Sequence, residues 1–342
     1  MKTVSVLKRV ARDLRRQTLG APNLMARQGC VEDFARCYAL HESCQLPYDE
    51  ACRRALAEMW RALLSNGSML LSLVENRAKP IGLRIVSFAA TIFVSDEFCC
   101  EVRSTRPPYL GVEITRCYLS RELPVLSREQ VARANAQDGL NVMMCFGGSE
   151  NAGMSREQIL AVREKQFEAF HLVHSGYYVK ELLADGIGEA ALHGMLDSGA
   201  RLRRDYSHYF GKHGARMPRT SQRPWLVGLT KEEAFARAGS HLSSFFVYTP
   251  PRFHFNRSEQ ALLQHALMGE TSQDLASSLF ISPWTVKKRW HAIYERVADV
   301  DSELLPSPVA GGVGVTSRGA ERRRHLLNYL RQHFEELRPF DR

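Results

Sequence analysis

Residues 255–297 read FNRSEQALLQHALMGETSQDLASSLFISPWTVKKRWHAIYERV, and they decide the fold of the C-terminal part of the chain. Three apolar patterns of helical spacing each follow polar residues that cap helices. The capping candidates are Asn256 or Ser258, Thr271 or Ser272, and Ser282. Gly269 ends the first helix, and Pro283 opens the third, where its missing N–H costs nothing. The stretch therefore predicts three short helices joined by tight turns.

Each of these helices has one apolar face and one polar face. The inward residues are Leu262, Leu263, Ala266 and Leu267, then Leu275, Ala276 and Leu279, then Val286, Trp290, Ile293 and Val297. The outer face of the third helix holds Trp284, Lys287, Lys288 and His291. A run of basic residues on a helix is usually only a solvated surface. On the third helix of this pattern it favours nucleic acid, because such side chains supply contacts to phosphates and to base edges.

The pattern resembles the helix-turn-helix domain of the LuxR/GerE class of bacterial transcription regulators, which reads L-T-x-x-E, then G-x-[ST]-N-x-E-I-A, then L-x-I-S-x-x-T-V-K. The positions in register are Glu259, Gly269, Asp274, Leu275, Ala276, Leu279, Ile281, Ser282, Thr285, Val286 and Lys287. The departures are Phe255-Asn256 for Leu-Thr, Ser272 for Asn, Arg289 for His, and Arg296-Val297 for Lys-Leu. None of these departures removes a core or cap residue.

The resemblance implies a set of DNA contacts on the third helix. Lys287, Lys288 and His291 would meet base edges in the major groove, with Trp284 on the same face. Thr285 and Arg289 would hold phosphates. The resemblance also implies a homodimer, with RNA polymerase as a further partner.

The chain after residue 300 departs from that class, in which a fourth helix usually provides a dimer contact. Pro306 and Pro308 follow 301–305 closely, so this helix is expected to be short or absent. Residues 306–319 suggest a linker, and 319–337 a helix with an apolar stripe. We expect the stripe to replace the missing dimer helix or to dock on the larger domain. A free basic tail on DNA is the third alternative.

Composition sets limits on the whole chain. Its 342 residues carry a formal net charge of +9, which suits a nucleic-acid partner but is weak support by itself. The sequence has no apolar run long enough to cross a membrane, and residues 1–20 indicate a basic amphipathic helix rather than a signal peptide. These features predict a cytoplasmic protein with no membrane contact.

All eight cysteines precede residue 150, at positions 30, 37, 44, 52, 99, 100, 117 and 145. Their spacing matches neither a C-x-x-C pair nor a zinc site. We interpret them as small apolar residues of the core. Cys30, Cys37 and Cys44 recur every seven residues, so a thiol-based redox-responsive regulator is an alternative.

Residues 1–250 predict a mixed α+β regulatory domain of unknown input, followed by the helix-turn-helix domain at 251–305 and the linker and helix at 306–342. Apolar residues that recur three or four positions apart predict helices at 4–17, 30–43, 48–65, 128–137, 156–184 and 188–197. Strands are predicted at 69–75, 83–94, 110–118, 140–146 and 243–249. The residues from Asn76 to Gly82 suggest a hairpin turn between the first two strands.

This order of a helix pair, a hairpin, a strand and a helix is similar to acetyltransferases of the GNAT superfamily. Those enzymes hold the coenzyme A pyrophosphate on backbone N–H groups of a Q/R-x-x-G-x-G/A loop. This chain lacks that motif, since Gly147-Gly148 is wrongly spaced. Acetyl transfer is therefore not expected, although such a fold, or a GAF- or PAS-like one, could still sense a small molecule.

Two further clusters have other interpretations. Arg201, Arg203, Arg204, Lys212, Arg216, Arg219 and Arg223 alternate with aromatic residues, which suggests a solvated linker more than a phosphate-binding surface. His171 and His174 have a spacing that can bind metal, but the sequence offers no further ligand pattern, and we predict no metal.

The main prediction is a sequence-specific transcriptional regulator that binds duplex DNA through 283–297, has no catalytic activity and needs no cofactor. A small-molecule effector would act on its N-terminal domain. The alternative is an acyl-CoA-using, GNAT-like enzyme or acyl-CoA sensor that carries a DNA-binding module.

Overall fold

The computed structural model describes residues 23–214, 216–236, 239–306 and 315–341, so the helix expected at 4–17 lies outside the described residues. Contacts divide the chain into two units. The sheet unit holds the residues up to 128 together with 140–174 and 179–246, and the helical unit holds 129–139, 175–178 and 247 onward. In the described part of the chain, no helix combines the length and apolar character needed to cross a membrane.

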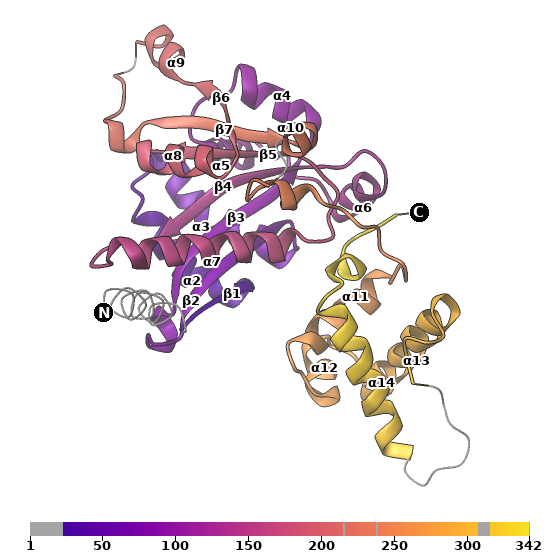
Figure 1. The fold of residues 1–342 in the computed structure, drawn as a ribbon. Coiled ribbons are helices and arrows are strands. Elements are labelled where there is room, and N and C mark those ends of the chain that lie inside the picture. Colours follow the sequence, from indigo (N-terminus) through magenta and orange to yellow (C-terminus); the bar gives the residue numbers. More distant parts are fainter. Residues whose placement is uncertain (1–22, 215, 237–238, 307–314, 342) are drawn as a thin grey trace, which may run out of the picture. The chain divides into compact units, whose positions relative to one another are not determined.

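The sheet unit is built on seven strands in the order β1-β2-β3-β4-β5-β7-β6 (Figure 1). Their bounds are β1 Leu24–Gln28, β2 Met69–Asn76, β3 Ile85–Val94, β4 Leu140–Ser149, β5 Val179–Ile187, β6 Arg201–Asp205 and β7 Pro224–Thr230. Every neighbouring pair is antiparallel except β4 and β5, which run parallel. The predicted mixed α+β class is confirmed.

Helices cover both faces of this sheet. One face packs against α2 (Phe34–Glu42), α3 (Glu50–Ser65) and α5 (Leu110–Leu119), and the other against α7 (Arg156–His174) and α8 (Glu189–Asp197) (Figure 1). Strand residues alternate between the two faces, as the pleat requires. Smaller elements complete the unit, namely α4 Asp96–Ser104, α9 Ser207–Lys212, α10 Lys231–Ala236 and the 3-10 turns η1 Val31–Asp33, η2 Ile81–Leu83, η3 Thr220–Gln222 and η4 Ser243–Phe246.

The main core lies between the sheet and α2, α3 and α5. Trp60 on α3 is fully buried and meets the rings of Phe88 on β3 and Phe146 on β4 at 5.7 and 4.9 Å between centroids. His41 on α2 also lies against Trp60, at 5.3 Å. Aromatic rings from both helices therefore fix this layer on the middle strands.

Much of the predicted order of elements is confirmed. The helices expected at 30–43, 48–65, 128–137 and 188–197 correspond to α2, α3, α6 (Arg128–Ala136) and α8, and the strands expected at 69–75, 83–94 and 140–146 to β2, β3 and β4. The turn between β2 and β3 joins two antiparallel neighbours, as a hairpin requires.

Three predictions were wrong. Residues 110–118 form α5 instead of a strand, because tertiary packing overrides the β-branched residues in this segment. The helix predicted over 156–184 ends at His174, and Gly176 in the left-handed region (φ +83°) turns the chain into β5. Residues 243–246 form the short turn η4 and not a strand.

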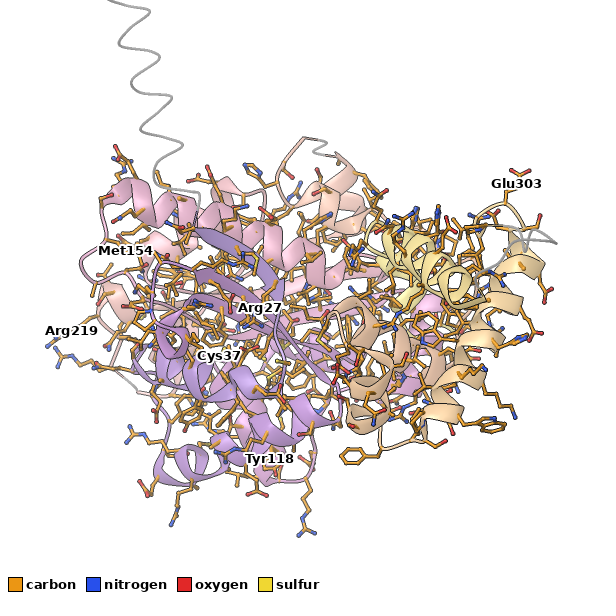
Figure 2. The ribbon with its side chains drawn as sticks, turned by 90° about the horizontal axis from the view of Figure 1, so that it is seen from below. Arg27, Cys37, Tyr118, Met154, Arg219 and Glu303 are labelled. Atoms are coloured by element: carbon orange, nitrogen blue, oxygen red, sulfur yellow. The ribbon has the colours of Figure 1, made fainter. Side chains whose placement is uncertain are left out.

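The arginine-rich segment after residue 200 is also not a linker. It supplies β6 and leads to β7, two strands that were not predicted. Arg201 and Arg203 both pair with Glu233 on α10. Arg223 pairs with Asp205 at 3.1 Å. Figure 2 shows Arg219 extending away from the unit, whereas Cys37 lies in its interior.

The helical unit contains the three helices expected from 255–297. They are α11 Arg257–Leu267, α12 Ser272–Ser278 and α13 Pro283–Val300. Asn256 and Glu259 form a reciprocal capping box at the start of α11, and Thr271 does the same with Asp274 at α12. Ser282 caps α13, with Pro283 in its first turn. Residues 301–306 contain no helix, as predicted.

The C-terminal helix α14 (Val315–Leu330) belongs to the same core as these three helices. Leu326, Leu327 and Leu330 are buried together with Leu262, Ile293 and other residues of α11 to α13. The 3-10 turn η5 (Phe334–Leu337) adds Leu337. The apolar stripe therefore has its partner within the helical unit.

Candidate functional site

The parallel pair β4 and β5 stops pairing before either strand ends. Its register runs from Leu140 opposite Val179 to Met144 opposite Ala184. Beyond that point both strands continue, β4 to Ser149 and β5 to Ile187, without further pairing between them. Backbone N–H and C=O groups at the open end of a strand pair need another partner, which a ligand can supply.

A β-bulge marks the same place on β4. Thr91 of β3 pairs with Met144, and the next residue, Ala90, pairs with Phe146, so Cys145 is the extra residue. Because of the bulge, Cys145 and Phe146 both contribute to the core on the face of α2, α3 and α5. Bulges re-aim side chains and often lie beside active sites.

Asp185 is the first residue of β5 beyond the paired segment. Its Oδ2 accepts a hydrogen bond from the backbone N–H of Leu110, and its Oδ1 is enclosed without a hydrogen-bond partner among the described residues. The residue as a whole is only half-buried, but its carboxyl group lies inside the protein, and this burial raises the pKa of Asp185 to about 7. A carboxyl group of this kind can accept a proton near neutral pH.

The start of α5 is built to reach this carboxyl group. Tyr109 precedes the helix in the left-handed conformation, with φ of 69°. Gly111 has no room for a side chain, because a Cβ there would lie 2.7 Å from the carbonyl oxygen of Cys145. The sequence Tyr109-Leu110-Gly111 therefore brings the positive end of the helix against β4 and Asp185.

Tyrosines surround Asp185 on this face. Burial, and then the charge on Asp185, raise the pKa of Tyr109 to about 12, and the same two causes raise that of Tyr206. The hydroxyl of Tyr206 is buried and has no hydrogen-bond partner within the part of the chain that the structure describes. Two enclosed polar atoms, Oδ1 of Asp185 and the Tyr206 hydroxyl, are thus left for a substrate or water to satisfy.

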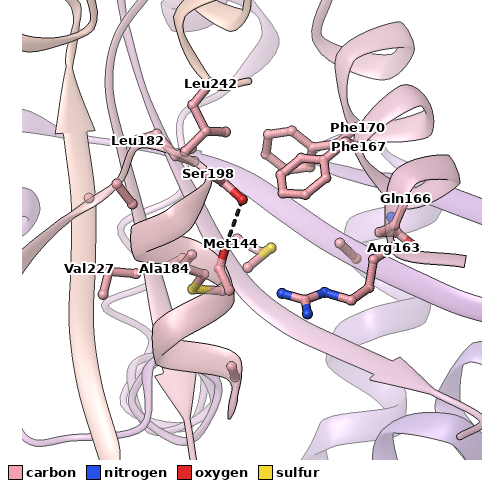
Figure 3. A pocket seen from close by; sticks show the side chains of 16 residues that line it. Met144, Arg163, Gln166, Phe167, Phe170, Leu182, Ala184, Ser198, Val227 and Leu242 are labelled. Atoms are coloured by element: carbon pink, nitrogen blue, oxygen red, sulfur yellow. Dashed lines mark hydrogen bonds between the residues drawn. The ribbon is translucent and has the colours of Figure 1, made fainter. Parts of the chain in front are cut away.

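The opposite face of the sheet carries an apolar cavity of about 250 Å³ between α7 and α8 (Figure 3). Met144 and Ala184, the last paired residues of β4 and β5, contribute to its lining. Phe167 and Phe170 of α7 and Leu242 add apolar walls. The cavity therefore reaches the open end of the strand pair from one face, while Cys145 and Asp185 reach it from the other.

Two contacts fix the part of the cavity wall that α8 forms. The Ser198 hydroxyl donates to the Gly194 carbonyl at 2.6 Å, the bond drawn in Figure 3. A Cβ on Gly194 would lie 1.6 Å from a terminal nitrogen of Arg163, so glycine is required for the guanidinium to lie against α8. Arg163 is the one charged side chain among the described residues that line this cavity.

The absence of the GNAT phosphate motif has a structural counterpart. Gly147 and Gly148 lie within β4. At the start of α7, Ser155 and Gln158 cap each other, with backbone-to-side-chain distances of 2.9 and 3.2 Å. The N–H of Gln158, in the turn whose amides hold pyrophosphate in the GNAT pattern, thus already has a partner within the chain.

The residues predicted to contact DNA lie on α13 of the helical unit. Trp284, Lys287, Lys288 and His291 are exposed, and the Lys288 ammonium lies 5.6 Å from the Trp284 ring centroid. Thr285 and Arg289 are half-buried. The Thr285 hydroxyl is 2.9 Å from the capping Ser282 hydroxyl, and His291 lies 3.3 Å from Glu295.

The other candidate residues, the cysteines and His174, lie in the sheet unit. All eight cysteines are free thiols, and five of them are buried. Burial raises the pKa of Cys30 and of Cys37 to about 12, so neither carries the thiolate that redox sensing needs. His174 is buried, with Nε2 2.8 Å from the Thr91 hydroxyl and Nδ1 2.7 Å from the Phe170 carbonyl oxygen.

No protein-family model matches the sequence, and comparison with characterised proteins finds no significant match. The solved structures similar to the chain include Arabidopsis thaliana NAA60 in complex with a bisubstrate analogue, at 13% identity and a TM-score of 0.35. They also include the C-terminal condensation domain of Ebony with beta-alanyl-dopamine, at 12% and 0.37, and Drosophila melanogaster polyamine N-acetyltransferase, at 16% and 0.34. Each match covers 60% of this chain and at least 97% of the other.

These findings correct the main prediction from the sequence. The comparison with solved structures contradicts the prediction of a transcriptional regulator without catalytic activity: the structures that share this fold include several N-acetyltransferases. The predicted similarity to the GNAT fold in the order of elements is supported. In this chain the parallel pair lies within an otherwise antiparallel sheet, and Asp185 and the apolar cavity lie at its open end.

Proposed function

We propose that the sheet unit is an acyltransferase that takes its acyl group from an acyl-CoA thioester. The observation that carries this proposal is the open end of the β4–β5 pair, which an apolar cavity meets on one face and Asp185 on the other. The cavity suits the pantetheine arm and acyl chain of the donor, which are long, thin and largely apolar. Side chains would contribute to holding the pyrophosphate, since the Gln158 N–H in the first turn of α7 is already bound by Ser155.

In the proposed reaction a neutral amine enters from the face of α2, α3 and α5. Its nitrogen bonds to the thioester carbonyl carbon, and the carbonyl electron pair moves onto oxygen. The Asp185 carboxylate takes the proton that the nitrogen loses. The C–S bond then breaks, the amide forms, and the departing thiolate takes that proton from Asp185. Unpaired backbone N–H groups of β4 near the bulge are the candidates to stabilise the oxyanion.

Calorimetric titration of the intact chain with acetyl-CoA tests the donor site. Ala191→Phe on α8 places a ring into the cavity and should abolish binding. Ala190→Phe is the matched control, because Ala190 is the exposed neighbour on the same helix and does not line the cavity. Equal binding by the two variants, or no binding by the wild type, would remove this assignment.

We also propose that the helical unit holds the enzyme on duplex DNA, as the alternative from the sequence included. In support, Trp284, Lys287, Lys288 and His291 are exposed together on one well-capped helix. Lys287→Ala with Lys288→Ala should weaken binding of the intact chain to DNA and reduce its salt dependence, whereas Arg331→Ala should not. Two predictions from the sequence remain predictions. One is a cytoplasmic location, which agrees with cysteines that are free thiols. The other is a homodimer.

A further inference from the structure

A second cavity, of about 380 Å³, lies at the loop between α2 and α3. Its lining residues are Tyr38, His41, Glu42, Gln45, Leu46, Tyr48, Arg53 and Leu56. It opens on the face of the sheet that holds Asp185, the face from which an acceptor would enter. His41, Tyr48 and Leu56 are buried at its inner end, whereas Glu42, Gln45 and Arg53 are exposed at its mouth.

The hydrogen bonds of His41 fix the polarity of the inner end. Its Nδ1 lies 3.2 Å from the carbonyl oxygen of Gly147 on β4, and a carbonyl only accepts, so Nδ1 carries the proton. Burial lowers the pKa of His41 to about 4, so the ring is neutral and its Nε2 is an acceptor. The Tyr48 hydroxyl, 2.8 Å from Nε2, must therefore donate to it.

Because its only proton is committed to His41, the Tyr48 oxygen can only accept a hydrogen bond from a ligand. The inner end of the cavity therefore selects an N–H or O–H donor. This end also lies towards the open strand pair, since His41 is bound to Gly147, and the pKa of Tyr48 is raised by burial and by the nearby Cys145 and Asp185.

The mouth of the cavity instead favours an anionic group of the ligand. Arg53 makes no ion pair or side-chain hydrogen bond within the described residues, so its guanidinium is available to an anion. Glu42, the carboxylate at the same mouth, is engaged by the Tyr38 hydroxyl. Between the two ends, Leu46, Leu56 and the Tyr38 ring form apolar walls.

We propose that this cavity binds the acyl acceptor and that the acceptor is an amino acid with an apolar or aromatic side chain. Its amine donates to Tyr48, its carboxylate pairs with Arg53, and His41 acts as a positioning residue that sets the direction of the Tyr48 hydrogen bond. This inference rests on the proposed acyltransferase function for the role of the ligand, but the binding itself does not require turnover.

Three probes that differ by one group test the proposal by calorimetry on the intact chain without acetyl-CoA. L-Phenylalanine has both the amine and the carboxylate, phenethylamine lacks the carboxylate, and 3-phenylpropionate lacks the amine. We expect L-phenylalanine to bind best. Loss of either group should weaken binding about tenfold or more, the usual effect of losing a hydrogen bond to a charged group.

Matched variants assign each end of the ligand. Arg53→Ala should bind L-phenylalanine no better than phenethylamine, whereas Arg54→Ala should behave as wild type, because Arg54 is on the same helix but pairs with Glu50 and does not line the cavity. Tyr48→Phe should weaken binding of both amines, whereas Tyr118→Phe, which removes a hydroxyl that bonds to Glu58 and does not line the cavity, should not. In turnover, Arg53→Ala should raise the KM for the amino acid and leave that for acetyl-CoA unchanged.

The outcomes separate this inference from the function on which it rests. If acetyl-CoA does not bind but L-phenylalanine binds through Arg53 and Tyr48, the acyltransferase is wrong and the amino-acid site stands. The amino-acid site is overturned if acetyl-CoA binds and L-phenylalanine does not. It is also overturned if Arg53→Ala binds L-phenylalanine as Arg54→Ala does and Tyr48→Phe binds it as its control variant does.

Discussion

Replacing Asp185 with asparagine should make the protein inactive and at the same time more stable above neutral pH. The carboxyl group has lost its water and receives only the Leu110 N–H, so the folded state holds its proton up to a pKa of about 7 in place of an ordinary 3.8. Keeping the ionised form inside the fold therefore costs on the order of 4 kcal/mol. Asparagine retains an oxygen for Leu110 and carries no charge.

The sign of the pH dependence follows from the raised pKa. Below pH 3.8 both the folded and the unfolded states hold the proton, and this group does not disfavour folding. As the pH rises from 3.8 to 7 the unfolded chain loses the proton first, so the free energy of unfolding falls, and above 7 the loss is complete. The asparagine variant lacks this contribution, so its advantage over wild type should grow between pH 4 and 7.

Denaturant unfolding at pH 5 and pH 8 measures the change in stability. Release of the thiol from acetyl-CoA in the presence of a mixture of amines measures the change in turnover. Loss of a general base lowers turnover by about 10²- to 10⁴-fold. Wild-type activity should rise as Asp185 ionises through pH 7. If Asp185→Asn is less stable than wild type at pH 8, or if it keeps wild-type turnover, Asp185 is not a buried base with a raised pKa.

Other substitutions test the supporting structure. Gly111→Ala should cost about 1–3 kcal/mol through overlap with backbone, whereas Gly211→Ala, where a Cβ meets open space, should be nearly neutral in the same denaturation assay. Leu330→Ala should cost about 2–5 kcal/mol if α14 is part of the helical core, and unchanged unfolding would contradict that packing. Glu233→Gln should destabilise the sheet unit at pH 7, and the difference from wild type should shrink as the pH falls below 4.5, because Arg203 lowers the pKa of this carboxyl and its stabilisation is lost as the pH falls through the lowered pKa.

Local signals were sufficient for the helical unit. Its caps at Asn256, Thr271 and Ser282 and the apolar spacing of its helices lie within a few residues of each other, so the sequence alone predicts the helices and their exposed face. That clarity misled the functional interpretation, because the most recognisable segment is not the one that holds the candidate site.

The sheet unit depends on contacts that the sequence does not reveal locally. Val112, Ile114 and Thr115 favour a strand, and only the docking of Gly111 against β4 explains a helix there. Asp185 lies in a segment whose spacing fits a helix as well as a strand, so its place beside the β4 bulge could not be predicted. Gly111 was the available signal, since a glycine inside a predicted strand often marks a place where another backbone approaches closely.

Hydrogen–deuterium exchange of the intact chain, with and without acetyl-CoA, tests the central claim most directly. The account predicts that the donor slows exchange at 144–149 of β4, at 184–187 of β5 and in the parts of α7 and α8 that line the cavity. No protection in these segments under saturating acetyl-CoA, or protection confined to other parts of the chain, would contradict it.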